Sequence, residues 1–257
     1  MTVVYLGWPL GSVEGIFRDY EPSRPLDLLV SFAYMKEWQR AVDAGIWPAA
    51  HIGQTMLDSG AYTAATTGRT IDRSALIAEQ RSGRWTETVA LDAIGDHKAS
   101  ESNWRWSVSQ GSDAFPTFHM GEPFEVLDRY VAESWKVGLG GVVGTAKGPL
   151  RSWLDKVFKR CWPARYHLFG CIDSLILNRY PFHSADSAIW FLQTIRYAHW
   201  AMPKGGSYIV KNRPTDERMP QCRYRIEELM DRSARLRVRW RRPLLECESK
   251  CPPRPES

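Results

Sequence analysis

Residues 88–118 read TVALDAIGDHKASESNWRWSVSQGSDAFPTF, and this stretch decides the expected fold. Thr88–Ala93 is a short apolar run that carries an acid near its end, Lys98–Gln110 has a helical pattern, and Ala114–Phe118 is apolar again. A strand, a helix and a second strand in this order predict two parallel strands joined by a crossover helix.

The same alternation recurs along most of the chain. Eight strands with intervening helices in roughly 200 residues predict a compact (β/α)8 TIM barrel in the α/β class. A doubly wound sheet is the alternative, but neither GxGxxG nor GxxxxGK[ST] follows a predicted strand, which disfavours a dinucleotide or P-loop site. The eight expected strands are Val3–Leu6, Leu28–Tyr34, Thr55–Asp58, Thr88–Ala93, Ala114–Phe118, Trp135–Leu139, Tyr166–Phe169 and Phe182–Asp186.

The composition is that of a soluble globular protein. Of 257 residues, 44% are hydrophobic and 25% are charged, which excludes disordered and collagen-like chains. No apolar run of about 18 residues is present, so no transmembrane helix is expected. The N-terminus lacks the pattern of a secretory signal, and the five cysteines are scattered, so we expect a cytoplasmic protein. We expect a barrel over 1–205, a basic extension over 206–242 and a disordered tail over 243–257.

The net charge of +5 is concentrated at the C-terminal end. Residues 232–257 contain eight Lys or Arg and three Asp or Glu, so this segment carries the whole excess. The alternation of basic and apolar residues predicts an edge strand with one basic face, suited to a polyanion; a solvated tail is the alternative. Its basic residues next to Trp240 are Arg235, Arg237, Arg239, Arg241 and Arg242.

Three acids lie where predicted strands end. Asp58, Asp92 and Asp186 would meet at one face, because the carboxyl ends of barrel strands open on the active-site side. Each has an alternative role in a turn or a helix cap. This alternative is weakest for Asp58, because Ser59-Gly60 follows and no helix is expected to start there.

Other polar and flexible positions follow two further strands. His119 ends one predicted strand, and Gly140-Gly141 ends the next. Glycines at such a position let a flat ligand approach the backbone N–H groups. The alternatives are a polar residue at the barrel rim for His119 and an ordinary turn for the glycines.

These motifs resemble those of the tRNA-guanine transglycosylase superfamily. Leu57–Tyr62 (LDSGAY) is similar to its Asp-Ser-Gly-Gly-Phe motif, although Ala61 and Tyr62 replace the second Gly and the Phe. Val89–Asp92, Gly138–Gly141 and Phe182–Ser187 resemble its base-recognising strand, its glycine-rich loop and its nucleophile strand. The likeness is closer to shorter phage and bacterial enzymes that insert 7-deazaguanine bases into DNA, which share phrases such as residues 29–34, 116–119 and 179–182.

The resemblance implies a pentosyltransferase that replaces guanine in DNA with a free 7-deazaguanine base such as preQ0. It implies that Asp186 is the nucleophile and Asp58 the general acid and base. It also implies that the target base leaves the stack of double-stranded or locally unpaired DNA, and that a phage-encoded chain would act in the host cytoplasm. The implied base-binding residues are Asp92, Ser59, Gly60, Tyr62, His119, Gly140 and Gly141, and the five arginines named above would contact the nucleic acid.

No cofactor, metal or membrane is expected. The tRNA enzymes carry a CxCxxC zinc motif, which this chain lacks. Cys222, Cys247 and Cys251 are the alternative metal ligands, and unpaired thiols are the favoured interpretation. Three other functions stay open: the same exchange on tRNA, a non-catalytic nucleic-acid-binding barrel, and a glycosidase acting on small sugars.

Overall fold

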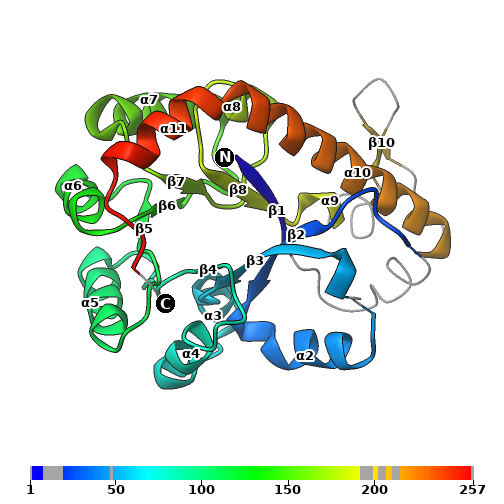
Figure 1. Cartoon of the computed structure of the whole chain (residues 1–257), viewed down its shortest axis with the longest axis horizontal. Coiled ribbons are helices and arrows are strands. Elements are labelled where there is room, and N and C mark those ends of the chain that lie inside the picture. The colour runs from blue at the N-terminus through cyan, green and yellow to red at the C-terminus, as the bar shows by residue number, and fades with distance from the viewer. Residues whose placement is uncertain are drawn as a thin grey trace.

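The computed structural model describes residues 2–7, 20–46, 49–191, 199–201, 207–209 and 215–255. Parallel strands with helices outside them make up most of this part of the chain (Figure 1). The strands are β1 Val3–Gly7, β2 Leu26–Ser31, β3 Ile52–Asp58, β4 Glu87–Thr88, β5 Thr117–His119, β6 Val137–Gly140, β7 Tyr166–Leu168, β8 Ser184–Ser187, β9 His199–Ala201 and β10 Ser207–Ile209. The helices are α2 Met35–Asp43, α3 Ala61–Thr67, α4 Arg73–Gln80, α5 His97–Ser109, α6 Phe124–Glu133, α7 Lys147–Cys161, α8 Ser174–Leu177, α9 Ile189–Phe191, α10 Thr215–Arg239 and α11 Arg241–Lys250, with short 3-10 turns at Phe32–Tyr34 and Ala49–His51.

Eight of these strands form one parallel sheet. Its order is β4-β3-β2-β1-β8-β7-β6-β5, so each strand lies beside its neighbour in sequence except where β1 pairs with β8. The sheet curls, and its edge strands β4 and β5 are connected by a single isolated parallel bridge between Val89 and Phe115. The result is an α/β fold with an open, curled half-barrel, compatible with a TIM-like fold.

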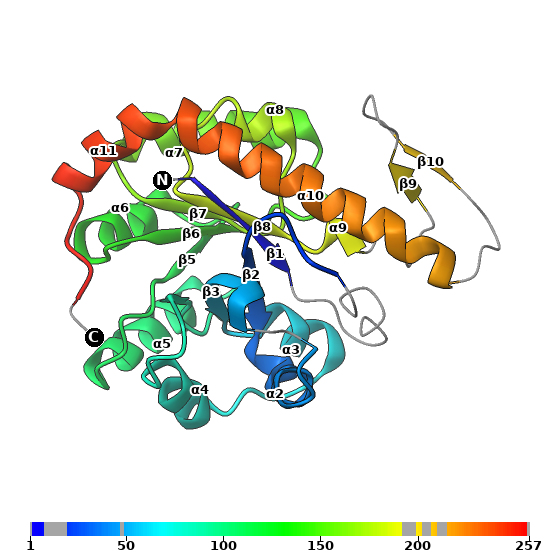
Figure 2. The same ribbon diagram turned by 45° about the vertical axis from the view of Figure 1, so that its right-hand side comes forward.

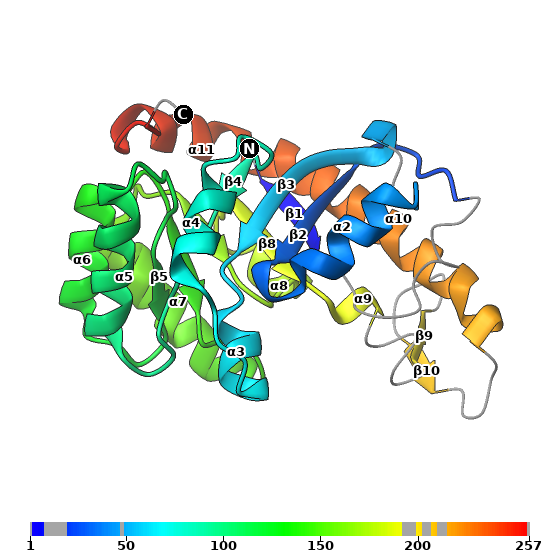
Figure 3. The same ribbon diagram turned by 90° about the horizontal axis from the view of Figure 1, so that it is seen from below.

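Each predicted strand overlaps an observed one, but β4 ends at Thr88, so Asp92 lies four residues beyond this strand and not at its end. Side chains of successive strand residues alternate between the two faces of the sheet, and the inner ones form a small apolar cluster of their own. This cluster contains Val3, Tyr5, Leu29, Met56, Val89, Phe115 and Trp135, with Phe169 packed against it. Outward residues such as Val4, Leu6 and Leu28 join the larger core under the helices. Figure 3 shows from below how helices such as α2, α4, α5 and α6 lie outside the strands.

The C-terminal segment is helical, so the predicted edge strand is wrong. α10 runs along β1, as Figure 2 shows, and contributes Ile226, Leu229 and Leu236 to the main core. Most of α11 and the described residues after it, up to 255, lie in the segment 243–257, for which the sequence predicts a disordered tail. In a strand, Leu236 and Val238 would face the same side of the sheet. In the helix they do not, because Leu236 is buried while Val238 is 79% exposed.

The helices of the described ranges include none that is long and apolar enough to cross a membrane. The short antiparallel pair β9–β10 lies apart from the main sheet, near α10 (Figure 2).

Candidate active site at the carboxyl ends of the strands

The parallel sheet brings several predicted site residues to one edge. Asp58 is the last residue of β3, His119 of β5 and Gly140 of β6, and His119 is in register with Gly140. Asp186 lies in β8, one residue before its end. All these strands run in the same direction, so their carboxyl ends share one side of the sheet.

Asp58 is half-buried and interacts with other carboxylates. The N–H of Gly60 donates to its Oδ2 at 2.9 Å. Burial raises the pKa of Asp58 to about 7, and the negative charges of Asp92 and Asp186 add to this rise against the opposing hydrogen bond from Gly60. The three predicted acids therefore interact electrostatically at this edge.

A helix does begin directly after Asp58, contrary to the expectation. Gly60 is the N-cap of α3 and has φ +82°. A Cβ at this position would lie 2.9 Å from the backbone nitrogen of Ala33, so both the backbone conformation and the available space require glycine.

Asp92 is held by two predicted residues. Ser59 Oγ donates to Asp92 Oδ1 at 3.2 Å, and His119 Nε2 lies 3.0 Å from Asp92 Oδ2. His119 Nδ1 also lies 3.1 Å from Oε1 of Glu122, whose other oxygen accepts from the His119 backbone N–H. Asp96, not Asp92, caps the following helix α5.

His119 is an imidazolium at neutral pH. Burial by itself lowers the pKa of this side chain, but the hydrogen bonds to Asp92 and Glu122 outweigh burial and raise it to about 9. Both ring nitrogens then carry protons and donate to the two carboxylates. Glu122 is not among the predicted site residues, although its position three residues after His119 in a strand-to-helix turn is a usable signal.

Asp186 has one engaged oxygen. Its Oδ1 lies 3.2 Å from His167 Nε2 and 2.9 Å from the backbone nitrogen of Gly170. Among the described residues, none donates to Oδ2, so this oxygen is available for chemistry. Ser187 Oγ accepts from the Ile189 N–H at 3.0 Å, which relieves Asp186 of the capping role. His167, fully buried in the middle of β7, was missed because it interrupts an apolar run without any recognisable motif.

The predicted glycines are required by close packing. A Cβ at Gly140 would lie 2.7 Å from Cδ2 of His119, and Gly141 has φ +72°.

Tyr62, in the first turn of α3, is 64% exposed and is therefore not the packed rim aromatic that its alternative interpretation describes.

The predicted arginines are not at this edge. Arg237 Nη2 lies 2.8 Å from Asp27 Oδ2, and its Nε donates to the carbonyl of Thr2, at the amino ends of β1 and β2. Arg239 donates at 3.0 Å to the carbonyl of Asn178, the residue directly after α8. Arg235, Arg241 and Arg242 are exposed on α10 and α11.

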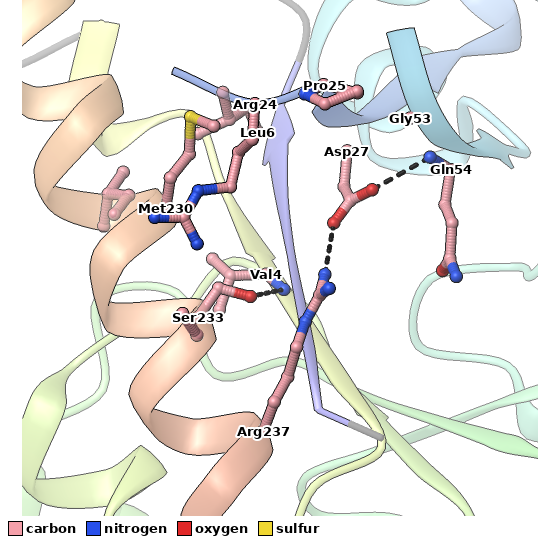
Figure 4. Close-up of a pocket in the computed structure, with 12 residues that line it drawn as sticks. Val4, Leu6, Arg24, Pro25, Asp27, Gly53, Gln54, Met230, Ser233 and Arg237 are labelled. Atoms are coloured by element: carbon pink, nitrogen blue, oxygen red, sulfur yellow. Dashed lines mark hydrogen bonds and ion pairs between the residues drawn. The ribbon is translucent and has the colours of Figure 1, made fainter. Parts of the chain in front are cut away.

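A cavity of about 340 Å³ lies beside Arg237, between α10 and the first residues of β1, β2 and β3 (Figure 4). Asp27 bridges its two sides, because one carboxylate oxygen pairs with Arg237 and the other accepts from the Gln54 N–H at 2.9 Å. The cavity contains none of the predicted acids.

The cysteines form no metal site in the described part of the chain. Cys247 Sγ and Cys251 Sγ are 3.1 Å apart, and Cys222 is buried in the main core. No group of three or more His, Cys, Asp or Glu side chains among the described residues is arranged to hold a metal ion.

Comparisons of the chain with protein-family models, with curated proteins and with solved structures gave no match, so the site itself carries the functional argument.

Proposed function

We propose that this chain is a transglycosylase that replaces guanine in DNA with a 7-deazaguanine base through a covalent intermediate on Asp186. The observation that carries the proposal is the pair of unlike carboxylates at one edge of the sheet. Asp58 has a pKa raised to about 7, whereas Asp186 accepts two hydrogen bonds on one oxygen and has no donor to the other among the described residues. Two carboxyl groups in different environments suit one acid–base and one nucleophilic role.

The first half of the reaction uses both residues. Asp186 Oδ2 bonds to C1′ of the nucleotide while the C1′–N9 bond breaks, and the bonding electrons pass to N9 of the leaving guanine. Asp58 in its protonated form gives that nitrogen its proton. A pKa of about 7 leaves both forms of Asp58 populated at neutral pH.

The second half reverses these steps with another base. Ionised Asp58 removes the proton from the ring nitrogen of the incoming base, which bonds to C1′ as the C1′–O bond to Asp186 breaks. The carboxylate of Asp186 is thereby restored, and the reaction has no net consumption of protons.

Asp92 is suited to hold the base. Its two oxygens each have one protein partner, Ser59 and His119, and each keeps a second lone pair for N–H groups of a purine-like ring. The positive charge of His119 balances Asp92 when no base is bound. We further assign the backbone of Gly140 and Gly141 to a base carbonyl and Tyr62 to stacking.

The finer fold assignment belongs to this proposal. We infer that the curled sheet is a (β/α)8 barrel whose β4–β5 seam is short. The Ala90 N–H donates to the Phe115 carbonyl at 2.9 Å, and the Phe115 N–H donates to the Thr88 carbonyl at 3.1 Å, which supports a seam at this place.

Mass spectrometry of nucleosides tests the function. Purified chain is incubated with preQ0 and either a guanine-containing oligodeoxynucleotide or unmodified tRNA, and the digested nucleosides are analysed. We expect a 7-deazaguanine deoxynucleoside and release of free guanine only from DNA. Incorporation only into tRNA would move the activity to the second candidate substrate. Binding of DNA without incorporation would indicate a non-catalytic module, and hydrolysis of free sugars a glycosidase.

A further inference from the structure

A chain of buried polar side chains extends from the inner face of the sheet to Asp186. Lys136 Nζ lies 2.5 Å from Glu87 Oε2 and 2.7 Å from Ser184 Oγ. Ser184 Oγ lies 2.8 Å from His167 Nδ1, and His167 Nε2 lies 3.2 Å from Asp186 Oδ1. Glu87 lies in β4, Lys136 directly before β6, His167 in β7 and Ser184 in β8. Residues that contact one another in this network are therefore not neighbours in sequence.

The hydrogen bonds can run in only one direction. The ammonium group of Lys136 has protons to donate and no lone pair, so Ser184 Oγ accepts from it. Ser184 Oγ keeps a second lone pair, so its contact with Lys136 alone does not fix the direction of its bond to His167. Among the described residues, His167 Nδ1 is the acceptor within reach of the Ser184 hydroxyl proton, and the carboxylate of Asp186 can only accept from Nε2. The two contacts together place the ring proton on Nε2.

The surroundings keep His167 neutral. This side chain has no exposed surface, and burial lowers its pKa below the ordinary value. The positive charge of Lys136 acts in the same direction, against the nearby Asp186. A neutral imidazole has two tautomers, and the hydroxyl of Ser184 and the carboxylate of Asp186 together select the one protonated at Nε2.

Such a network has a cost in stability. Lys136 is almost completely buried, and its ammonium lies 5.0 Å from the ring centre of Phe115 in the apolar inner cluster. A buried ion pair of this kind is often no more stabilising than well-packed apolar residues of the same size. The network therefore needs an explanation other than stability.

We propose that Glu87, Lys136, Ser184 and His167 form a positioning relay, which fixes His167 as the Nε2–H tautomer and so holds Asp186 by Oδ1 with Oδ2 free to bond to the sugar. This inference rests on the proposed role of Asp186 as nucleophile. The relay moves no proton during the reaction. It acts through Asp186, and its residues are positioning residues.

The tautomer is tested without any measurement of activity. Long-range ¹H–¹⁵N spectra of protein labelled with ¹⁵N-histidine distinguish the two neutral tautomers, and loss of a signal in His167→Phe assigns His167. We expect a protonated Nε2 and an unprotonated Nδ1 in the wild type, and a change to a mixture of tautomers in Ser184→Ala. A protonated Nδ1 in the wild type, or the same spectrum in Ser184→Ala, would overturn the relay.

Kinetics test its effect on Asp186. His167→Phe keeps a ring but loses the donor, and we expect kcat for base exchange to fall about 100-fold at an unchanged KM, as for a reacting group misplaced by about 1 Å. His167→Gln restores a donor at a similar reach and should recover at least about 10-fold of this loss. Equal losses in the Phe and Gln variants would contradict positioning.

The matched control is Ser107→Ala, which removes another buried hydroxyl, one that donates to the Trp104 carbonyl in α5. We expect its kcat to equal that of the wild type, and melting temperatures to show that all variants fold. An equal fall of kcat in Ser107→Ala and Ser184→Ala would show that the loss of any buried hydroxyl, and not loss of the relay, lowers kcat. A wild type without exchange would refute the proposed function, and the tautomer spectra would then decide the relay alone.

Discussion

Charged side chains have different partners at the two ends of the parallel sheet. At the amino end, carboxylates are paired with arginines: Arg237 with Asp27, and Arg254 with Asp113 at 2.7 Å. At the carboxyl end, Asp58 interacts electrostatically with Asp92 and Asp186, and the charged or ionisable partners of Asp92, Glu122 and Asp186 among the described residues are histidines.

The ion pairs at the amino end hold the fold together, whereas the acids at the carboxyl end form the candidate active site. Paired charges at the amino end connect the C-terminal segment to the sheet, because Arg237 belongs to α10 and Arg254 follows α11. At the carboxyl end, burial raises the pKa of Asp58 to about 7, and repulsion from Asp92 and Asp186 adds to this rise. In barrel enzymes, the carboxyl ends of the strands carry the active site, in agreement with this division.

The largest expected effect is the loss of activity in Asp186→Asn. The amide cannot act as the nucleophile, so exchange of labelled base into DNA should fall by at least about 10⁴-fold, as when other enzymes lose theirs. Arg254→Gln, at the opposite end of the sheet, is the control and should keep its kcat. Retained incorporation in Asp186→Asn would show that another residue is the nucleophile.

The next largest effect concerns the contribution of the buried Lys136–Glu87 ion pair to stability. Lys136→Met leaves Glu87 as a buried and unpaired charge, so the free energy of unfolding should fall by about 3–5 kcal/mol. In the double variant Lys136→Met/Glu87→Gln, most of this loss should disappear. Denaturation in urea measures both, and an equal loss in the single and double variants would argue against a buried ion pair.

His119 should make stability depend on pH. Its pKa is raised from 6.5 to about 9 in the folded chain, so its stabilising contribution is complete below pH 6.5 and is lost as pH rises through 9. Between these values the free energy of unfolding of the wild type should fall relative to that of His119→Gln. Urea denaturation at several pH values tests this, and parallel pH profiles of the two proteins would contradict an imidazolium between Asp92 and Glu122.

The smallest effect concerns the exposed arginines. Arg235 lies on α10 with Arg237, which contacts Thr2 at the amino end of β1, and Arg241 and Arg242 begin α11. A five-residue strand such as β1 separates the two ends of the sheet by about 15 Å. A duplex that reaches both ends must extend about five base pairs from the target base. Replacing all three with Gln should lower the salt dependence of long-duplex binding by about 0.9 in log–log slope for each lost phosphate contact. An unchanged slope would remove these arginines from the nucleic-acid contact.

Much of the architecture could be predicted from local patterns. Short apolar runs between helical segments located all eight strands, because burial of both faces makes such strands continuous in hydrophobicity. The acids and His119 could be placed at one edge from strand direction alone. The arginine segment was misassigned, since residues 235–239 alternate in sequence while the helical repeat from Cys222 through Ile226 to Leu236 decides their structure.

Local patterns of apolar residues and turns are sufficient to place the strands, with Asp58 at the end of one and Asp186 next to the end of another. The surroundings of these acids depend on how the strands pack in three dimensions. Glu87, Lys136, Ser184 and His167 are up to 97 residues apart, and their contacts arise from the curl of the sheet, which no local pattern encodes. The raised pKa of Asp58 has the same origin, because burial and neighbouring charges depend on distances through space.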